Sequence, residues 1–164
     1  MDYLSPCRFY LTTFKKVDNS AKVENYFELL KHYRRYGYTS IHKAMKKCIY
    51  VAEDNAAIRD MIEFLLVEEQ YDVKSCPSKN SFWQQMAMQK PDMVILDVML
   101  PDGSGVEICN QLKHSVKTYQ IPIMMMSAGN QLSKVKNDCD AEDYINKPFD
   151  LNDFVVRIEH HLAS

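Results

Sequence analysis

From Met45 onward, short apolar runs rich in β-branched residues alternate with amphipathic stretches, and this alternation constrains the fold most strongly. Short apolar runs predict buried strands, and apolar residues at helical spacing predict helices packed on a sheet. We predict strands over 48–52, 71–75, 92–97, 121–127 and 143–146. We predict helices over 55–69, 78–90, 106–112, 132–138 and 151–162. Because right-handed crossovers between parallel strands place helices on both faces, the pattern predicts a doubly wound α/β domain with a five-stranded parallel sheet.

Polar side chains follow or end four of the five predicted strands. Glu53 and Asp54 follow the first strand, Asp97 ends the third, Ser127 ends the fourth, and Lys147 follows the fifth. In such sheets, ligands bind at the carboxyl ends of the strands, where the winding reverses. The flavodoxin-like order 2-1-3-4-5 would leave the second strand at the edge and make the other four neighbours. We therefore predict that order and a single site along one rim of the sheet.

The chemistry of this site follows from its charges. Carboxylates about 4 Å apart repel by about 4 kcal/mol per pair at an effective dielectric constant of about 20. Three of them must therefore take up protons or bind a cation. Oxygen ligands alone favour Mg²⁺, which also accepts phosphate oxygens. A lysine and a hydroxyl facing the same point supply the positive charge and the hydrogen-bond donor that a phosphoryl group needs.

Charge and composition exclude several other classes of function. Residues 45–164 contain twelve Lys and Arg against eighteen Asp and Glu, so this part is a poor candidate for direct nucleic-acid binding. No apolar run approaches the roughly 18 residues of a membrane span, and the N-terminus lacks the pattern of a secretion signal. Five cysteines without C-x-x-C spacing are typical of buried thiols in a reducing compartment. We expect a cytoplasmic protein with no membrane partner.

Residues 1–44 form a separate N-terminal extension in this interpretation, ahead of the α/β domain at 45–164. They contain nine of the seventeen Tyr and Phe residues, and we predict one helix with an aromatic face over 20–36. A lone helix of this length is marginal in water, so such a helical arm would dock on the α/β body or on a partner. Alternatively, Met45 is the physiological start. The sequence does not separate these two interpretations.

Four segments together resemble the receiver domain of two-component response regulators. They are Ile49–Asn55, Val94–Gly105, Met126–Ala128 and Asp143–Phe149, and their order and spacing are highly specific. The resemblance covers residues 45–164, and this part of the chain is similar to a stand-alone, chemotaxis-regulator-like receiver. The sequence departs from the family pattern between Ser127 and Lys147. There, the fourth helix is expected to be short, and residues 139–142 replace the usual glycine-containing turn.

The resemblance implies a role for each residue of the site. Asp97 would be the phosphoacceptor, which attacks a phosphohistidine of a sensor histidine kinase or a histidine phosphotransfer protein. Asp54, Asp97 and the backbone carbonyl of Met99 would ligate Mg²⁺, and Glu53 would act directly or through water.

The resemblance also implies roles around the phosphoryl group. Ser127 would bind a phosphoryl oxygen, and Lys147 would pair with Asp97 or with its phosphate. Tyr144 would be the switch residue beside Ser127, and the peptide bond between Lys147 and Pro148 would be cis.

The expected function is that of a phosphorelay switch in signal transduction, without enzymatic activity beyond a slow autophosphatase. Phosphorylation would change binding to an unknown downstream protein, and homodimerisation stays open. One alternative is a phosphohydrolase with an aspartyl nucleophile. Such enzymes place a second aspartate two residues after the nucleophile as general acid, whereas this chain has Met99, which cannot transfer a proton. Another alternative is a scaffold that binds partners without phosphorylation through its N-terminal helix.

Overall fold

The computed structural model describes residues 46–129 and 132–163. The predicted helix over 20–36, the domain boundary at residue 45 and the interpretation of Met45 as the start lie outside these ranges. Within the ranges, no helix is both long and apolar enough to cross a membrane.

Five parallel strands form one sheet, in the order β2-β1-β3-β6-β7. The strands are β1 (Cys48–Ala52), β2 (Asp72–Cys76), β3 (Met93–Asp97), β6 (Ile123–Ala128) and β7 (Asp143–Lys147). The predicted order 2-1-3-4-5 is therefore confirmed. The register places Asp97 opposite Met126, so the carboxyl ends of β3 and β6 lie side by side.

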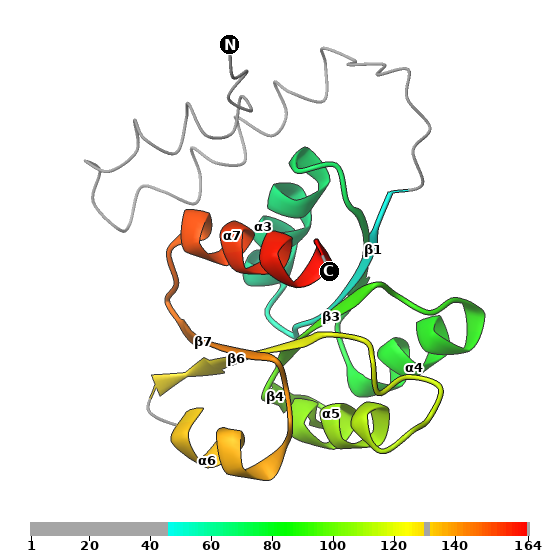
Figure 1. Ribbon diagram of the computed structural model, residues 1–164. Helices are drawn as coiled ribbons and strands as arrows, with labels where there is room; N and C mark the ends of the chain where they lie inside the picture. The colour runs from blue at the N-terminus through cyan, green and yellow to red at the C-terminus, as the bar shows by residue number, and fades with distance from the viewer. Residues whose placement is uncertain (1–45, 130–131, 164) are drawn as a thin grey trace. The chain divides into compact units, whose positions relative to one another are not determined.

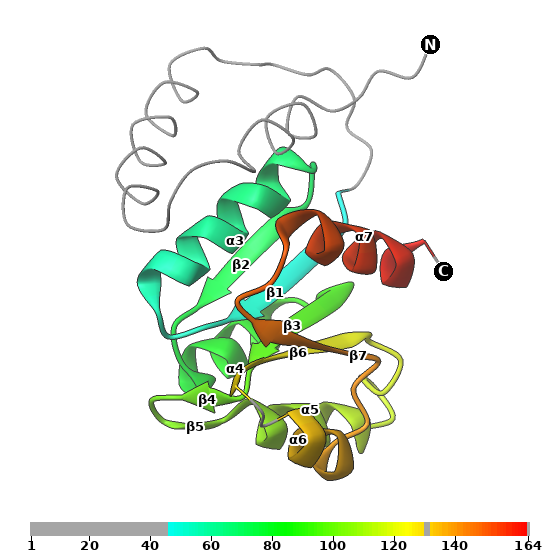
Figure 2. The same cartoon turned by 90° about the vertical axis from the view of Figure 1, so that its left-hand side faces the viewer.

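Five helices in the described part of the chain cover the sheet. They are α3 (Ala56–Glu68), α4 (Lys79–Met88), α5 (Gly105–Lys113), α6 (Leu132–Asp138) and α7 (Leu151–Leu162). Figures 1 and 2 show α3 and α7 on one face and α4, α5 and α6 on the other. This is the doubly wound arrangement that the sequence predicts. The fourth of these helices, α6, has seven residues and is short, as expected.

The core follows from the alternation of side chains along each strand. Every residue of β1 and β3 is buried, as expected of central strands covered on both faces. The cluster beneath α4, α5 and α6 includes Tyr50, Ala52, Val94, Leu96, Met125, Phe82, Ile108 and Leu112. In β6, Met124, Met125 and Met126 are fully buried, which confirms that they are core residues. The four described cysteines are buried free thiols, also as predicted.

A small antiparallel hairpin, which was not predicted from the sequence, follows Asp97. Its strands are β4 (Met99–Leu100) and β5 (Gly103–Ser104), and it lies beside the amino end of α4 (Figure 2). The Pro-Asp-Gly sequence indicated a turn here, but two-residue strands are too short to leave an alternating pattern. The hairpin shapes the chain between the site and α5.

Candidate functional site

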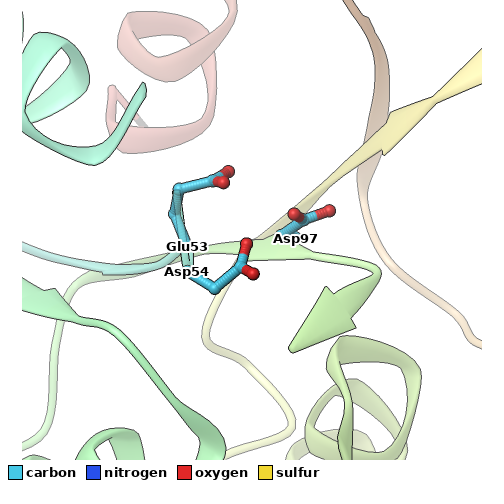
Figure 3. Close-up of side chains that lie close together, drawn as sticks. All are labelled: Glu53, Asp54 and Asp97. Atoms are coloured by element: carbon cyan, nitrogen blue, oxygen red, sulfur yellow. The ribbon is translucent and has the colours of Figure 1, made fainter. Parts of the chain in front are cut away.

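Three carboxylates converge at the carboxyl ends of β1 and β3 (Figure 3). Glu53 and Asp54 follow β1, and Asp97 is the last residue of β3. One oxygen of each carboxylate lies within 4.8 Å of the others. Glu53 is fully buried and Asp97 is 8% exposed, whereas Asp54 is exposed to solvent. The cluster therefore opens to solvent on the side of Asp54.

Lys147 brings a positive charge into this cluster from the end of β7. Its Nζ donates to Glu53 Oε2 at 2.5 Å and to Asp97 Oδ2 at 2.8 Å. The lysine side chain is 14% exposed, so little water competes for these bonds. When all four groups are ionised, the site holds one ammonium and three carboxylates, so it keeps an excess of negative charge.

Burial and the ion pairs shift the pKa values in this site. Burial raises the pKa of Glu53 above its usual value, and the hydrogen bond from Lys147 opposes this effect. Burial acts to lower the pKa of Lys147, but the hydrogen bonds that it donates to Asp97 and Glu53 outweigh this effect and raise that pKa overall. The lysine therefore stays an ammonium group at neutral pH.

Backbone contacts hold the acidic residues in place. Arg59, on α3, donates through one guanidinium nitrogen to the carbonyl of Glu53 at 2.9 Å and to that of Asp54 at 3.1 Å. Asn55 caps α3 directly after these residues. Gly105 packs against the other side of the site, where a Cβ would lie 2.1 Å from the backbone oxygen of Asp97. Neither Arg59 nor Gly105 was predicted from the sequence as a support of the site.

Met99 and Ser127, the next two predicted site residues, lie on the segment after Asp97 and on the strand beside it. The backbone N–H of Met99 approaches Asp97 Oδ1, with 3.4 Å between nitrogen and oxygen, so this segment of main chain lies beside the carboxylate. Ser127 is fully buried in β6, one residue past the partner of Asp97, and its hydroxyl makes a long 3.4 Å bond to the carbonyl of Ala128. Met99 therefore lies beside the Asp97 carboxylate, and Ser127 lies on the neighbouring strand.

Tyr144 lies in β7 and its hydroxyl contacts the turn before that strand. The hydroxyl donates to the carbonyl of Cys139 and accepts from the N–H of Ala141 at 3.1 Å. In this conformation the tyrosine therefore binds the 139–141 turn. The peptide bond between Lys147 and Pro148 is cis, as the sequence resemblance implies.

The donor set of the cluster fits a magnesium ion. Glu53, Asp54 and Asp97 offer carboxylate oxygens alone, from three side chains close enough to share one ion. Mg²⁺ prefers such oxygen ligands and keeps part of its water shell, which the exposure of Asp54 allows. A cation here would also offset the excess of negative charge.

The sheet order and the acidic pocket are those of a flavodoxin-like α/β domain with its site at the carboxyl ends of the central strands. The family model for the response regulator receiver domain matches residues 49–159. The chain belongs to this family of receiver domains. Receiver domains are phosphoacceptor switches of two-component signalling that bind Mg²⁺ in an acidic pocket and interact with sensor histidine kinases and downstream effectors.

Solved structures agree with this membership. A protein from Chloroflexus aurantiacus J-10-fl assigned as a response regulator is 28% identical, with a TM-score of 0.68 over 73% of this chain and 99% of that chain. The BeF3-activated DrrB receiver domain is 25% identical, with a TM-score of 0.64 over 73% of this chain and 100% of that one. The signal receiver domain of a histidine kinase from Syntrophus aciditrophicus shares the fold at 21% identity, with a TM-score of 0.67 over 71% of this chain and 90% of its own.

Proposed function

We propose that Asp97 accepts a phosphoryl group from a phosphohistidine in a Mg²⁺-dependent step, and that the resulting acyl phosphate changes which partner the chain binds. The observation that carries this proposal is the convergence of three carboxylates, two of which, those of Glu53 and Asp97, bond to Lys147. In the reaction, a carboxylate oxygen of Asp97 bonds to phosphorus. The N–P bond of the donor breaks, and its electron pair stays on the imidazole.

Asp54, Asp97 and the backbone carbonyl of Met99 would hold the ion, with Glu53 acting directly or through water. A bound Mg²⁺ supplies positive charge to the oxygens of the phosphoryl group as it is transferred. The exposed side of the cluster, at Asp54, is where a donor can approach. Glu53, which is buried and bonded to Lys147, would set the position of the ammonium group.

Lys147 and Ser127 would bind the phosphoryl group once it is on Asp97. Lys147 already bonds to one oxygen of Asp97, so it can follow the new negative charge with a small movement. The 3.4 Å bond of the Ser127 hydroxyl is weak and easily exchanged for a phosphoryl oxygen. These movements would bias the region around β6 and β7, including Tyr144, between two packings.

The donor would be a sensor histidine kinase or a histidine phosphotransfer protein, and the output would be binding to a downstream protein or to a second copy of the chain. No direct role in nucleic-acid binding is proposed, because residues 45–164 carry more acidic than basic groups. Slow hydrolysis of the acyl phosphate by water would reset the switch. The buried free thiols support a reducing, cytoplasmic location as part of this proposal.

The proposal is tested by incubating the full chain with acetyl phosphate and Mg²⁺ and measuring intact mass. We expect the mass of one added phosphoryl group, which should be absent when EDTA is present throughout the incubation and absent from Asp97→Asn. Asp60→Asn, which neutralises an exposed aspartate on α3, serves as the matched control and should be labelled like the wild type. An unchanged wild-type mass, or equal labelling of Asp97→Asn, would contradict the proposal.

A further inference from the structure

The β4–β5 hairpin contains Met99. In the proposed function, the backbone carbonyl of Met99 would be a magnesium ligand. Each of its strands has two residues, and a two-stranded hairpin is marginal on its own in water. Its base is held because Val98 N–H donates to the carbonyl of Met126 and Gly105 N–H donates to that of Val98. The far end of the hairpin needs an anchor of its own if the main chain at Met99 is to keep one position.

Asp102, at the tip of the hairpin, makes this anchor with the first residues of α4. Its Oδ1 accepts from the backbone N–H of Lys79 at 2.7 Å, and its Oδ2 accepts from that of Asn80 at 2.8 Å. The first amides of a helix have no partner within the helix, and the helix dipole favours a negative charge beside them. These hydrogen bonds also lower the pKa of Asp102, so its carboxylate stays ionised.

Further contacts at the same corner fix the tip between two helices. The ammonium of Lys79 pairs with Glu107, in the first turn of α5, at 2.6 Å. The side chain of Lys79 lies against Gly103, where an added Cβ would be 2.7 Å from Nζ. Gly103 also has φ +156, which favours glycine. The tip of the hairpin is therefore packed closely against the start of α4.

The bonds of Asp102 are not needed to start α4, because that helix has its own cap. The hydroxyl of Ser78 accepts from Ser81 N–H, and the hydroxyl of Ser81 accepts from Ser78 N–H, which together form a capping box. What Asp102 adds is a connection between two elements. The connection runs from the exposed surface of α4 to the segment that follows Asp97.

We propose that Asp102 is a positioning residue for magnesium binding: by docking the hairpin on the amino end of α4, it holds the Met99 carbonyl in place for an ion bound by Glu53, Asp54 and Asp97. The inference rests on the proposed function, since it assumes that this cluster binds Mg²⁺. It assigns no contact between Asp102 and the ion. Its effect passes through the backbone from residue 102 to residue 99.

Titration calorimetry of the full chain with Mg²⁺ tests this role. We expect Asp102→Ala to weaken Mg²⁺ binding about 3- to 10-fold, at or below the low end of the loss seen when a support of a metal ligand is removed. Ser78→Ala is the matched control: it removes the cap of the same helix, so it should lower the unfolding temperature but leave Mg²⁺ affinity near the wild-type value.

A reciprocal pair of variants tests the same bond from the side of the helix. Lys79→Pro removes the donor N–H at the first helical position, where proline is tolerated, while Lys79→Ala keeps that N–H and loses the pair with Glu107. Mg²⁺ affinity should fall further in Lys79→Pro than in Lys79→Ala, because only the proline variant loses the N–H that Asp102 accepts from. With acetyl phosphate, Asp102→Ala should need about 3- to 10-fold more Mg²⁺ for half-maximal labelling, in proportion to the loss of affinity, and reach the wild-type rate at saturation.

The outcomes separate this inference from the proposed function. If the wild type binds Mg²⁺ and both Asp102→Ala and Lys79→Pro bind it equally well, the positioning role is wrong and the proposed function stands. A loss of affinity in Ser78→Ala as large as that in Asp102→Ala would also overturn the role, because stability of α4 would then explain it. A wild type that binds no Mg²⁺ overturns both.

Discussion

At the scale of single residues, the site is held together against repulsion between like charges. Asp54 is exposed, so solvent screens much of its repulsion from Glu53 and Asp97. We expect Asp54→Asn to raise the free energy of unfolding in EDTA by about 1 kcal/mol, because one of three clustered carboxylates becomes neutral. Added Mg²⁺ should then stabilise the variant less than the wild type. Urea unfolding with and without Mg²⁺ measures both effects.

Asp60→Asn is the control for this prediction, since it neutralises an exposed aspartate on α3 that is not part of the cluster. It should change stability by less than about 0.5 kcal/mol under either condition. Equal stabilisation of Asp54→Asn and Asp60→Asn would show that general surface charge, and not the cluster, controls stability.

Glu53 gives the site a dependence on pH. Burial raises its pKa in the folded protein above the 4.5 of the unfolded chain, despite the bond from Lys147. The stability that comes from this bound proton is fully present below the unfolded pKa and is lost as pH rises through the folded pKa. In EDTA, the wild type should therefore lose stability relative to Glu53→Gln as pH rises through this window. Urea unfolding at a series of pH values checks this, and parallel curves would contradict it.

At the scale of elements, the contact between β3 and α5 leaves no room for a side chain at residue 105. An alanine Cβ there would lie 2.1 Å from the carbonyl oxygen of Asp97, so the helix or the strand must move. We expect Gly105→Ala to lower the free energy of unfolding by about 2 kcal/mol or more. Gly129→Ala is the control: it has open space but φ +67, and should cost about 1 kcal/mol. A smaller loss for Gly105→Ala than for Gly129→Ala in urea unfolding would contradict this packing.

The turn between α6 and β7 depends on the hydroxyl of Tyr144. Removing it leaves the carbonyl of Cys139 and the N–H of Ala141 without this partner, so Tyr144→Phe should destabilise the fold by about 1 kcal/mol. Hydrogen exchange at Ala141 should become faster. Tyr119→Phe, whose ring is half exposed, is the control and should have a smaller effect. If Tyr144 is the switch residue, turning toward Ser127 would release both bonds, which therefore oppose switching.

The elements that support the site were harder to predict from sequence than the site residues themselves. Asp97 and Lys147 could be singled out because each stands at or directly after the end of a predicted strand, and parallel strands bring such ends together. Arg59 and Asp102 act by bonding to backbone groups of a neighbouring element. Such bonds need no residue pattern at either end, so nothing in the periodicity of the sequence indicates them.

At the scale of the whole molecule, the strand order was predictable because four of the five predicted strands end at polar residues. The order 2-1-3-4-5 makes these four strands neighbours, so that their polar ends lie along one edge of the sheet. The sheet order and the family match confirm that reasoning for the α/β domain. As a switch, the domain would need about 5.5 kcal/mol of difference in stabilisation to move from 1:99 to 99:1 between two states. The phosphoryl group, Lys147 and Ser127 would have to supply most of it, and the two bonds of Tyr144 would subtract from it.

Whether Asp97 is the phosphoryl acceptor is tested most directly by locating the modified residue. Borohydride reduces an aspartyl phosphate to homoserine, so the chain is labelled with acetyl phosphate and Mg²⁺, reduced, digested and analysed by peptide mass spectrometry. We predict homoserine at position 97 in the sample with Mg²⁺ and unreduced aspartate there in the sample with EDTA. Reduction at Asp54 or at another acidic residue, with position 97 unchanged, would contradict the assignment of Asp97 as the acceptor.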